Sequence, residues 1–184
     1  MKRAFAAVLV ALSLPLASPA FAQPVVYDKS EIRFVSKQMG MEVEGRFRRW
    51  KATVDFRPAE LAQSRADFDI DLASIDLATE ESEAEVRRAD WFDTPRFPSA
   101  TFRSSAVRAL GGDRYEVTGK LAMKGVTRDV VVPVDVRRDA AGNTVAEARF
   151  AIKRLLYRVG DGPWSDPSAV ADDVAVRARI VLGK

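Results

Sequence analysis

The chain has 184 residues, a length that suits one domain with a single hydrophobic core. It contains no cysteine and no histidine, which excludes disulfides, thiol or imidazole catalysis, and metal sites built from those ligands. The formal net charge is only +3, and no stretch gathers enough basic residues to indicate a nucleic-acid partner. These absences favour a binding protein over an enzyme.

The first residues have the pattern of a secretory signal peptide. A basic start precedes an almost wholly apolar run over residues 4–17, and Ala20-Phe21-Ala22 offers an A-x-A cleavage site. The apolar run is shorter than the roughly 20 residues that span a bilayer. We therefore expect residues 1–22 to be a cleaved leader, and residues 23–184 to be one exported domain, located in the periplasm.

Beyond the leader, apolar and polar residues alternate strictly along most of the chain. Runs with this period of two residues cover 41–47, 50–56, 66–72, 115–123, 130–136, 146–152 and 174–182, with shorter ones at 32–34 and 100–102. Such runs are typical of strands with one apolar and one wet face, and they favour an antiparallel sheet. Glycine-containing turns separate successive strands at 111–113, 124–125 and 140–143.

One segment breaks the alternation and predicts a short helix. Thr79 is a suitable N-cap for a helix over Glu80–Ala89, whose first turn is acidic and whose last turn contains Arg87 and Arg88. An aromatic pair, Trp91-Phe92, and two prolines follow, so the helix cannot continue.

Nine or ten strands in one antiparallel sheet leave exposed edges unless the sheet closes on itself. The predicted fold is therefore all-β: a lipocalin-like antiparallel β-barrel with one short α-helical insertion. A two-sheet sandwich is the alternative. A barrel of about this many strands is wide enough to hold a small or elongated ligand.

The inward face of the predicted barrel combines large and small side chains. The candidate ligand-binding residues of the lumen are Phe34, Val43, Phe47, Phe68, Ile70, Phe102, Leu121, Ala148, Phe150 and Ile152. Small residues on the same face, among them Gly45, Gly119, Ala146 and Ala178, leave volume unfilled, which favours a cavity. The same residues are also compatible with a solid core and with tight strand bends.

Two acidic segments contain carboxylates that could in principle serve catalysis or bind a cation. Asp67, Asp69 and Asp71 alternate with the apolar face of their strand, so we expect them to point into solvent. Asp161 and Asp166 flank Trp164 in a loop that is either an ordinary turn or a cap for the barrel, and their spacing lacks the register of a calcium loop. No metal site, cofactor or catalytic constellation is expected.

Motifs spread over nearly all of the mature chain resemble the YceI family. The strongest similarity is Phe92 through Phe102, which fits the family's F-x-x-x-x-[FY]-P-x-[AI]-x-F signature. The other similar stretches are FVSKQMG at 34–40, GRF at 45–47, IDLASID at 70–76, VTGKL at 117–121 and MKGVT at 123–127. The resemblance implies a secreted, lipocalin-like barrel that binds polyisoprenoid or related long-chain lipids.

The chain departs from that family in two places. Many members carry a histidine in the first bend and another on the helix, where this chain has Gln38-Met39 and Glu83-Ala84-Glu85-Val86. Any role that those histidines have in other members is therefore absent from this chain. The segment Gly160–Asp166 resembles a subgroup whose genes accompany membrane b-type cytochromes, an association that favours an isoprenoid quinone as ligand.

The sequence therefore predicts a periplasmic protein that binds, transports or stores a long apolar lipid, a polyisoprenoid or isoprenoid quinone, in the barrel lumen. The alternative is a periplasmic protein-interaction or stress-response module with a solid barrel core and no lipid. A transient contact with a membrane protein and a homodimer are left open.

Overall fold

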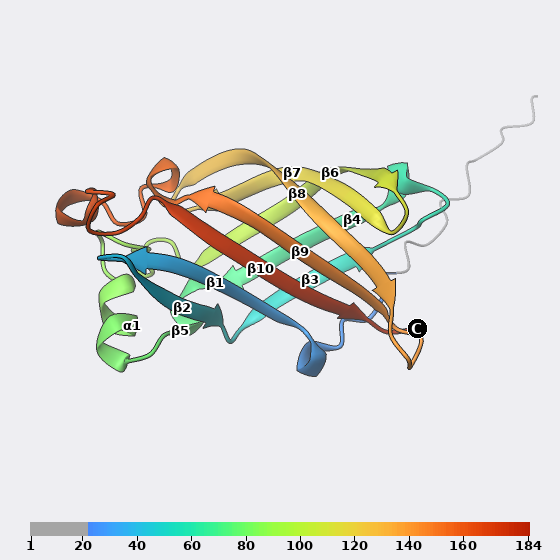
Figure 1. The fold of residues 1–184 in the computed structure, drawn as a ribbon, viewed down its shortest axis with the longest axis horizontal. Helices are drawn as coiled ribbons and strands as arrows, with labels where there is room; N and C mark the ends of the chain where they lie inside the picture. The colour runs from blue at the N-terminus through green and yellow to red at the C-terminus, as the bar shows by residue number, and fades with distance from the viewer. Residues whose placement is uncertain (1–21) are drawn as a thin grey trace, which may run out of the picture.

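The computed structural model describes residues 22–184, which form one ten-stranded antiparallel sheet curled into a barrel (Figure 1). The predicted leader lies outside the described residues, apart from Ala22. The strands are β1 (Glu31–Gln38), β2 (Met41–Phe47), β3 (Trp50–Asp55), β4 (Arg65–Asp71), β5 (Ile75–Asp76), β6 (Ser99–Gly111), β7 (Arg114–Met123), β8 (Val126–Arg138), β9 (Thr144–Lys153) and β10 (Asp173–Leu182). The all-β, lipocalin-like prediction is confirmed.

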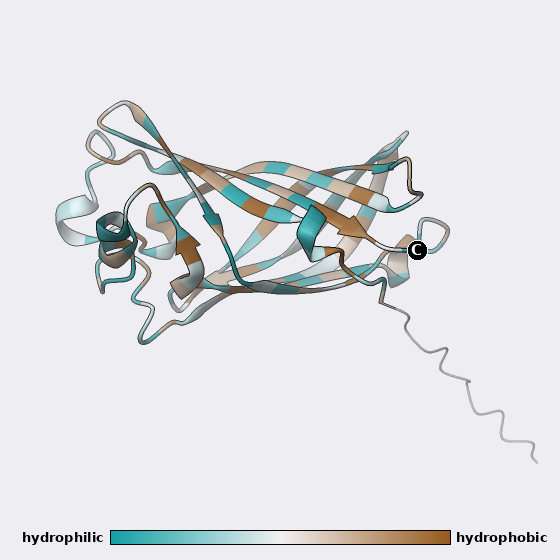
Figure 2. Ribbon diagram, turned by 90° about the horizontal axis from the view of Figure 1, so that it is seen from below, coloured by the Kyte–Doolittle hydropathy of each residue, from teal (hydrophilic) through white to brown (hydrophobic). Residues whose placement is uncertain are grey.

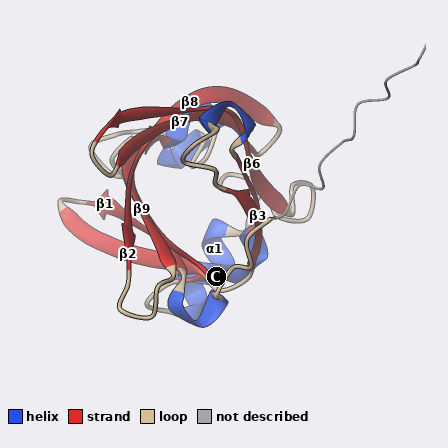
Figure 3. Ribbon diagram, turned by 90° about the vertical axis from the view of Figure 1, so that its right-hand side faces the viewer, coloured by secondary structure: helices blue, strands red, loops and turns tan. Residues whose placement is uncertain are grey.

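The sheet has the strand order β3-β4-β6-β7-β8-β9-β10-β1-β2-β5. Its two ends meet because β3 continues β2 after a two-residue corner, while β5 continues β4 after a short 3-10 turn (Leu72–Ser74). The corner is bonded to that turn: the Arg48 N–H donates to the Ser74 carbonyl, and the Asp71 N–H donates to the Arg49 carbonyl. The end-on view of Figure 3 shows the strands arranged in a ring.

The N-terminal segment fills the space where β3 diverges from β10 and β1. The Gln23 N–H donates to the Val54 carbonyl, and the Val26 N–H donates to the Val181 carbonyl, both at 2.8 Å. The Tyr27 ring lies 5.0 Å from the Trp50 ring, centroid to centroid. We call residues 23–29 the N-terminal strap.

The helix is shorter than predicted. α1 spans Glu80–Val86, and Thr79 caps it through its side chain as expected. It ends early because the next residues turn back on themselves: the Phe92 N–H donates to the Val86 carbonyl, and the Asp90 carbonyl accepts bonds from Gly160 and Asp161. Within the described residues, no helix has the length and hydropathy that crossing a membrane requires.

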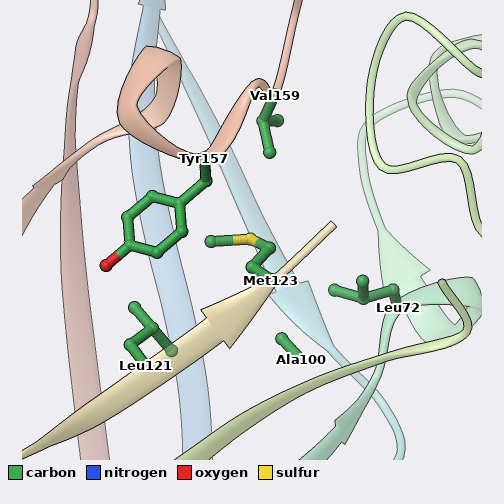
Figure 4. Packing of buried hydrophobic residues seen from close by; sticks show 6 residues of the cluster. All are labelled: Leu72, Ala100, Leu121, Met123, Tyr157 and Val159. Carbon is green, nitrogen blue, oxygen red and sulfur yellow. The ribbon is translucent and has the colours of Figure 1, made fainter. Parts of the chain in front are cut away.

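Apolar and polar residues alternate along the strands, so the barrel wall has an apolar and a polar face. Figure 2 shows this alternation as bands of brown and teal along the strands. At each end of the barrel a buried cluster packs the interior. One contains Leu72, Ala100, Leu121, Met123, Tyr157 and Val159 and lies on the α1 side (Figure 4). The other contains Ile32, Val54, Ile180 and Leu182 and lies beside the strap. Between the two clusters the interior is not filled.

Candidate functional site: a cavity along the barrel axis

A cavity of about 630 Å³ runs through the barrel, and every strand of the sheet contributes to its wall. This volume falls within the range of about 300–1,000 Å³ that is typical of small-molecule sites. All ten residues predicted to face the lumen line it: Phe34, Val43, Phe47, Phe68, Ile70, Phe102, Leu121, Ala148, Phe150 and Ile152. Their contact with a ligand stays a prediction.

The cavity is elongated because the wall strands are long. β10 has ten residues, which at ~3.3 Å per residue gives roughly 33 Å of strand. With a tilt of about 40° to the barrel axis, that strand covers roughly 25 Å of lumen. The core is therefore not solid, and residues along the whole length of the strands, from Ile152 to Leu182, line its free space.

Small residues create this space in a different way from the one predicted. Ala146, Ala148 and Ala178 line the cavity and leave room there. Gly45 and Gly119 do not line it, because the rings of Phe34 and Phe102 lie directly over them and occupy the position of a Cβ. These two glycines let aromatic rings lie flat against the wall; they do not add free volume.

The cavity reaches the surface beside α1. Gln38 at the end of β1 and Glu81 and Ser82 on the helix are exposed, and all three form part of the cavity wall. The β1–β2 turn next to Gln38 also carries two strongly exposed side chains, Met39 (73%) and Met41 (70%). This opening is polar on the helix side and apolar on the hairpin side.

Behind this entrance, one buried arginine organises the loop over 154–172, which we call the cap loop. Arg154 is 3% exposed, and its guanidinium has no carboxylate within ion-pair distance among the described residues. All five of its N–H groups donate to loop carbonyls, those of Val159, Gly160, Trp164, Val170 and Ala171, at 2.6–3.0 Å. Burial lowers the pKa of Arg154.

Two tryptophans lie beside that arginine in the cavity wall. The rings of Trp91 and Trp164 are 5.5 Å apart, and the Arg154 guanidinium carbon is 5.8 Å from the Trp91 ring. The Trp164 loop thus caps the barrel, as one of the two interpretations of the sequence proposed. The Trp91 Nε1–H is buried without an acceptor among the residues that the structure describes.

At the opposite end, the polar groups in the cavity wall are bonded within the protein. Asp55 forms a two-point ion pair with Arg57, and the Ser64 hydroxyl accepts a bond from the Arg57 N–H. The Arg65 guanidinium donates to the carbonyls of Ala62 and Ser64. None of these groups needs a ligand to complete its bonding.

Among the cavity-wall residues that the sequence-based list did not include, Arg154 and Trp91 stand out because they are polar or large and lie under the cap loop. Ala148, Phe150 and Ile152 lie on the inner face of β9, and Arg154 continues this series two residues further on. A charged residue at a position expected to face inward was the signal that could have identified it. The acidic strand behaves as predicted, since Asp69 pairs with Arg103 on the outer surface. In the part of the chain that the structure describes, no three acidic side chains gather as a metal site.

The fold and the cavity define a lipocalin-like barrel with an apolar lumen. The model of the YceI-like domain matches residues 24–182, so the chain belongs to the YceI family. A UPF0312 protein of Azotobacter vinelandii is 30% identical over 137 residues, 72% of this chain and 71% of that protein. One from Vibrio cholerae is 31% identical over 138 residues, covering 72% of both chains.

Solved structures agree with this assignment. The crystal structure of BcnA from Burkholderia cenocepacia is 42% identical and has a TM-score of 0.83, covering 87% of this chain and all of that one. A polyisoprenoid binding domain from Saccharophagus degradans has a TM-score of 0.71, covering 89% of this chain and 99% of that one. At 18% identity, this second similarity shows the shared fold alone.

Proposed function

We propose that this protein is a non-enzymatic carrier that holds a long-chain apolar lipid, a polyisoprenoid or isoprenoid quinone, along the barrel axis. The observation that carries the proposal is the cavity itself: about 630 Å³ of space, lined almost wholly by apolar side chains and drawn out along the strands. An empty apolar cavity destabilises a protein, and a bound chain removes that penalty.

The chemistry of the wall supports the same ligand class. Each methylene that leaves water contributes about 0.8 kcal/mol, so a dozen buried carbons suffice for tight binding without many polar contacts. The relative from Saccharophagus degradans, described as a polyisoprenoid binding domain, shares this fold. The leader pattern favours the periplasm as the place of action, where an apolar molecule needs a carrier to cross an aqueous space.

The proposal is tested by replacing a small residue of the cavity wall with a large one, which reduces the free volume. Ala148 lies on β9 opposite Val134 and Ala178 and faces the lumen. In Ala148→Phe the new ring occupies space that the ligand chain would use. If two methylenes lose their place, affinity falls by about 1.6 kcal/mol, which is somewhat more than a tenfold loss. The measurement is lipid content by organic extraction and mass spectrometry, with titration of the extracted protein.

Ala151→Phe is the matched control, since Ala151 lies on the same strand but on the outer, exposed face. It should leave lipid uptake unchanged. The carrier proposal fails if purified wild-type protein holds no lipid and takes none up. The protein-interaction module then takes its place, and Ala148→Phe should melt at a lower temperature with no lipid displaced.

A further inference from the structure

Four arginines form one row across the outer wall of the barrel. In the register of the sheet, Arg33 of β1 lies opposite Arg46 of β2 on one side and opposite Arg177 of β10 on the other. Arg177 in turn lies opposite Arg149 of β9, and all of these side chains are exposed. With ~4.8 Å between neighbouring strands, the row crosses roughly 14 Å of the surface. We call these residues the arginine row; Figure 1 shows β1, β10 and β9 side by side.

Carboxylates of the protein neutralise only half of this row. Arg33 and Arg46 each pair with a carboxylate, at 2.7 and 2.6 Å. Arg149 and Arg177, which lie directly opposite each other, form no ion pair with any residue that the structure describes. Like charges directly opposite each other in a sheet are destabilising. This pair therefore does not serve the stability of the sheet, and an external anion would relieve its repulsion.

The neighbours of the arginine row on the same outer face differ between its two sides. Toward the strap, Glu147 pairs with two further arginines, at 3.0 and 2.6 Å, so charges there are matched within the protein. Toward the capped end, the register places Val35 opposite Ala175, and Ala175 opposite Ala151. Because these side chains are short and uncharged, a broad surface can approach the guanidinium groups from that side.

The setting of the row favours a bilayer surface over a peptide strand. β1, β10 and β9 each have a paired strand on both sides, so they offer no free edge to which a partner strand could add. Contact is therefore made through side chains, over a wall three strands wide. The margins of this wall carry apolar side chains, Val131 at 54% and Met39 at 73% exposed. Cationic groups beside exposed apolar ones are the combination that binds anionic phospholipid.

Acidic residues restrict where such a surface can rest. Glu42 and Glu44 are exposed on β2, and the first turn of α1 is acidic, so anionic head groups avoid that side. On β10, Asp173 is already paired with a lysine at 3.0 Å. The contact is therefore centred on β1, β10 and β9. β1 ends at Gln38, which lines the cavity at its opening, so a bilayer that lies along β1 is close to that opening.

We propose that the outer wall of β1, β10 and β9 docks this protein on a bilayer that contains anionic phospholipid, with the arginine row contacting the lipid phosphates. The docking surface goes beyond the proposed carriage of a lipid in the lumen. It lies on the opposite face of the wall from the cavity, so its function does not depend on whether the cavity is filled.

The test measures co-sedimentation with vesicles, either of phosphatidylcholine alone or of phosphatidylcholine mixed with phosphatidylglycerol. Wild type should bind the mixed vesicles, and binding should be lost at about 1 M salt, where the Debye length is about 3 Å. In the double variant Arg149→Gln, Arg177→Gln, the partition coefficient should fall roughly 30-fold, equivalent to about 2 kcal/mol. The Tm of this variant at low salt should not fall, because the substitutions remove a repulsion.

The double variant Arg108→Gln, Arg114→Gln is the matched control, since it removes the same charge from exposed positions on β6 and β7. It should bind the mixed vesicles as wild type does. The proposal is overturned if both double variants lose the same amount of binding, or if wild type binds phosphatidylcholine alone equally well. If wild type ignores the vesicles but binds poly-glutamate through Arg149 and Arg177, the partner is an acidic protein and the membrane proposal is wrong. Lipid content of the same samples reports on the carrier function separately.

Discussion

The two ends of the barrel are closed by different physical means. At the end next to α1, the cap loop is gathered around one buried guanidinium that donates to five carbonyls. At the other end, the N-terminal strap lies across the sheet and is held by several separate contacts. These are backbone bonds to β3 and β10, side-chain bonds of Gln23 and Tyr27 to the backbone after and within β3, and one aromatic contact. The capped end therefore depends on a single side chain, and the strapped end depends on none in particular.

This difference matters for function because the two ends differ in polarity as well. The capped end carries an opening beside α1 and a buried cation whose donors are all bonded to loop carbonyls, whereas the wall at the strapped end carries the Asp55–Arg57 ion pair. Substitutions at each end show how far the two closures are independent.

The largest effect is expected at the centre of the capped end. Arg154→Leu removes all five donors and leaves buried carbonyls without partners, so we expect the free energy of unfolding to fall by about 4 kcal/mol. Arg154→Lys restores the charge but offers only three donors in a different geometry, and should lie in between. Urea unfolding followed by fluorescence measures both.

Arg149→Leu is the control for that experiment. Arg149 lies on β9 with its side chain exposed, and the change should alter stability by no more than about 0.5 kcal/mol. If Arg154→Leu is no more damaging than this control, the cap loop is held by something other than the guanidinium, and the contrast between the two ends disappears.

The wall of the barrel was predictable from sequence, and the closures of its ends were not. Strict alternation gives each strand an inside and an outside, so residues such as Phe68 and Phe150 were placed correctly in the lumen. The turn at Lys124-Gly125 was also visible, and both residues have positive φ. Strand faces and tight turns are determined by residues that are close together in the sequence, so they can be predicted from it.

The missed features depend on contacts between distant segments. Arg154 is surrounded by carbonyls up to 17 residues away, and no periodicity encodes that arrangement. The strap pairs Val25 with Leu182, almost the whole mature chain apart. The helix was predicted three residues too long: it ends at Val86, and Asp90 beyond it is bonded through its carbonyl to the distant Gly160 and Asp161 N–H groups. Gly45 was assigned to free volume because its partner, Phe34, lies on a different strand.

A smaller effect is expected at the strapped end. Tyr27→Ala removes the ring contact with Trp50 and the bond from the Ala52 N–H to the Tyr27 hydroxyl. The aromatic pair is worth about 0.5–1.5 kcal/mol and the bond about 1 kcal/mol, so we expect a loss of about 2 kcal/mol. Tyr27→Phe keeps the ring and should lose about half of that. A loss as large as that of Arg154→Leu would show that the strap, too, depends on one residue.

The smallest effect concerns pH and the surface network that joins α1 to the β2–β3 corner. Hydrogen bonds from Arg48 and then Arg46 lower the pKa of Asp76 from 3.8 to about 2. Arg48 also reaches Glu83 of the helix at 3.5 Å. Because the folded-state pKa is depressed, the ionised carboxylate stabilises the fold at neutral pH, and this contribution is lost as the pH falls through the window from 3.8 to about 2. Asp76→Asn should therefore lower Tm slightly at pH 7 and reduce the fall in Tm across that acid window. The effect should be modest and weakened by salt, since the arginines are solvent-exposed. Thermal unfolding of both proteins along a pH series measures it.

Because the network supports α1, acid should loosen the capped end before the strapped end, and amide exchange should accelerate first in α1 rather than at Val26 and Val181. Equal acid sensitivity of wild type and Asp76→Asn would contradict this assignment and would move the origin of acid unfolding to the remaining carboxylates.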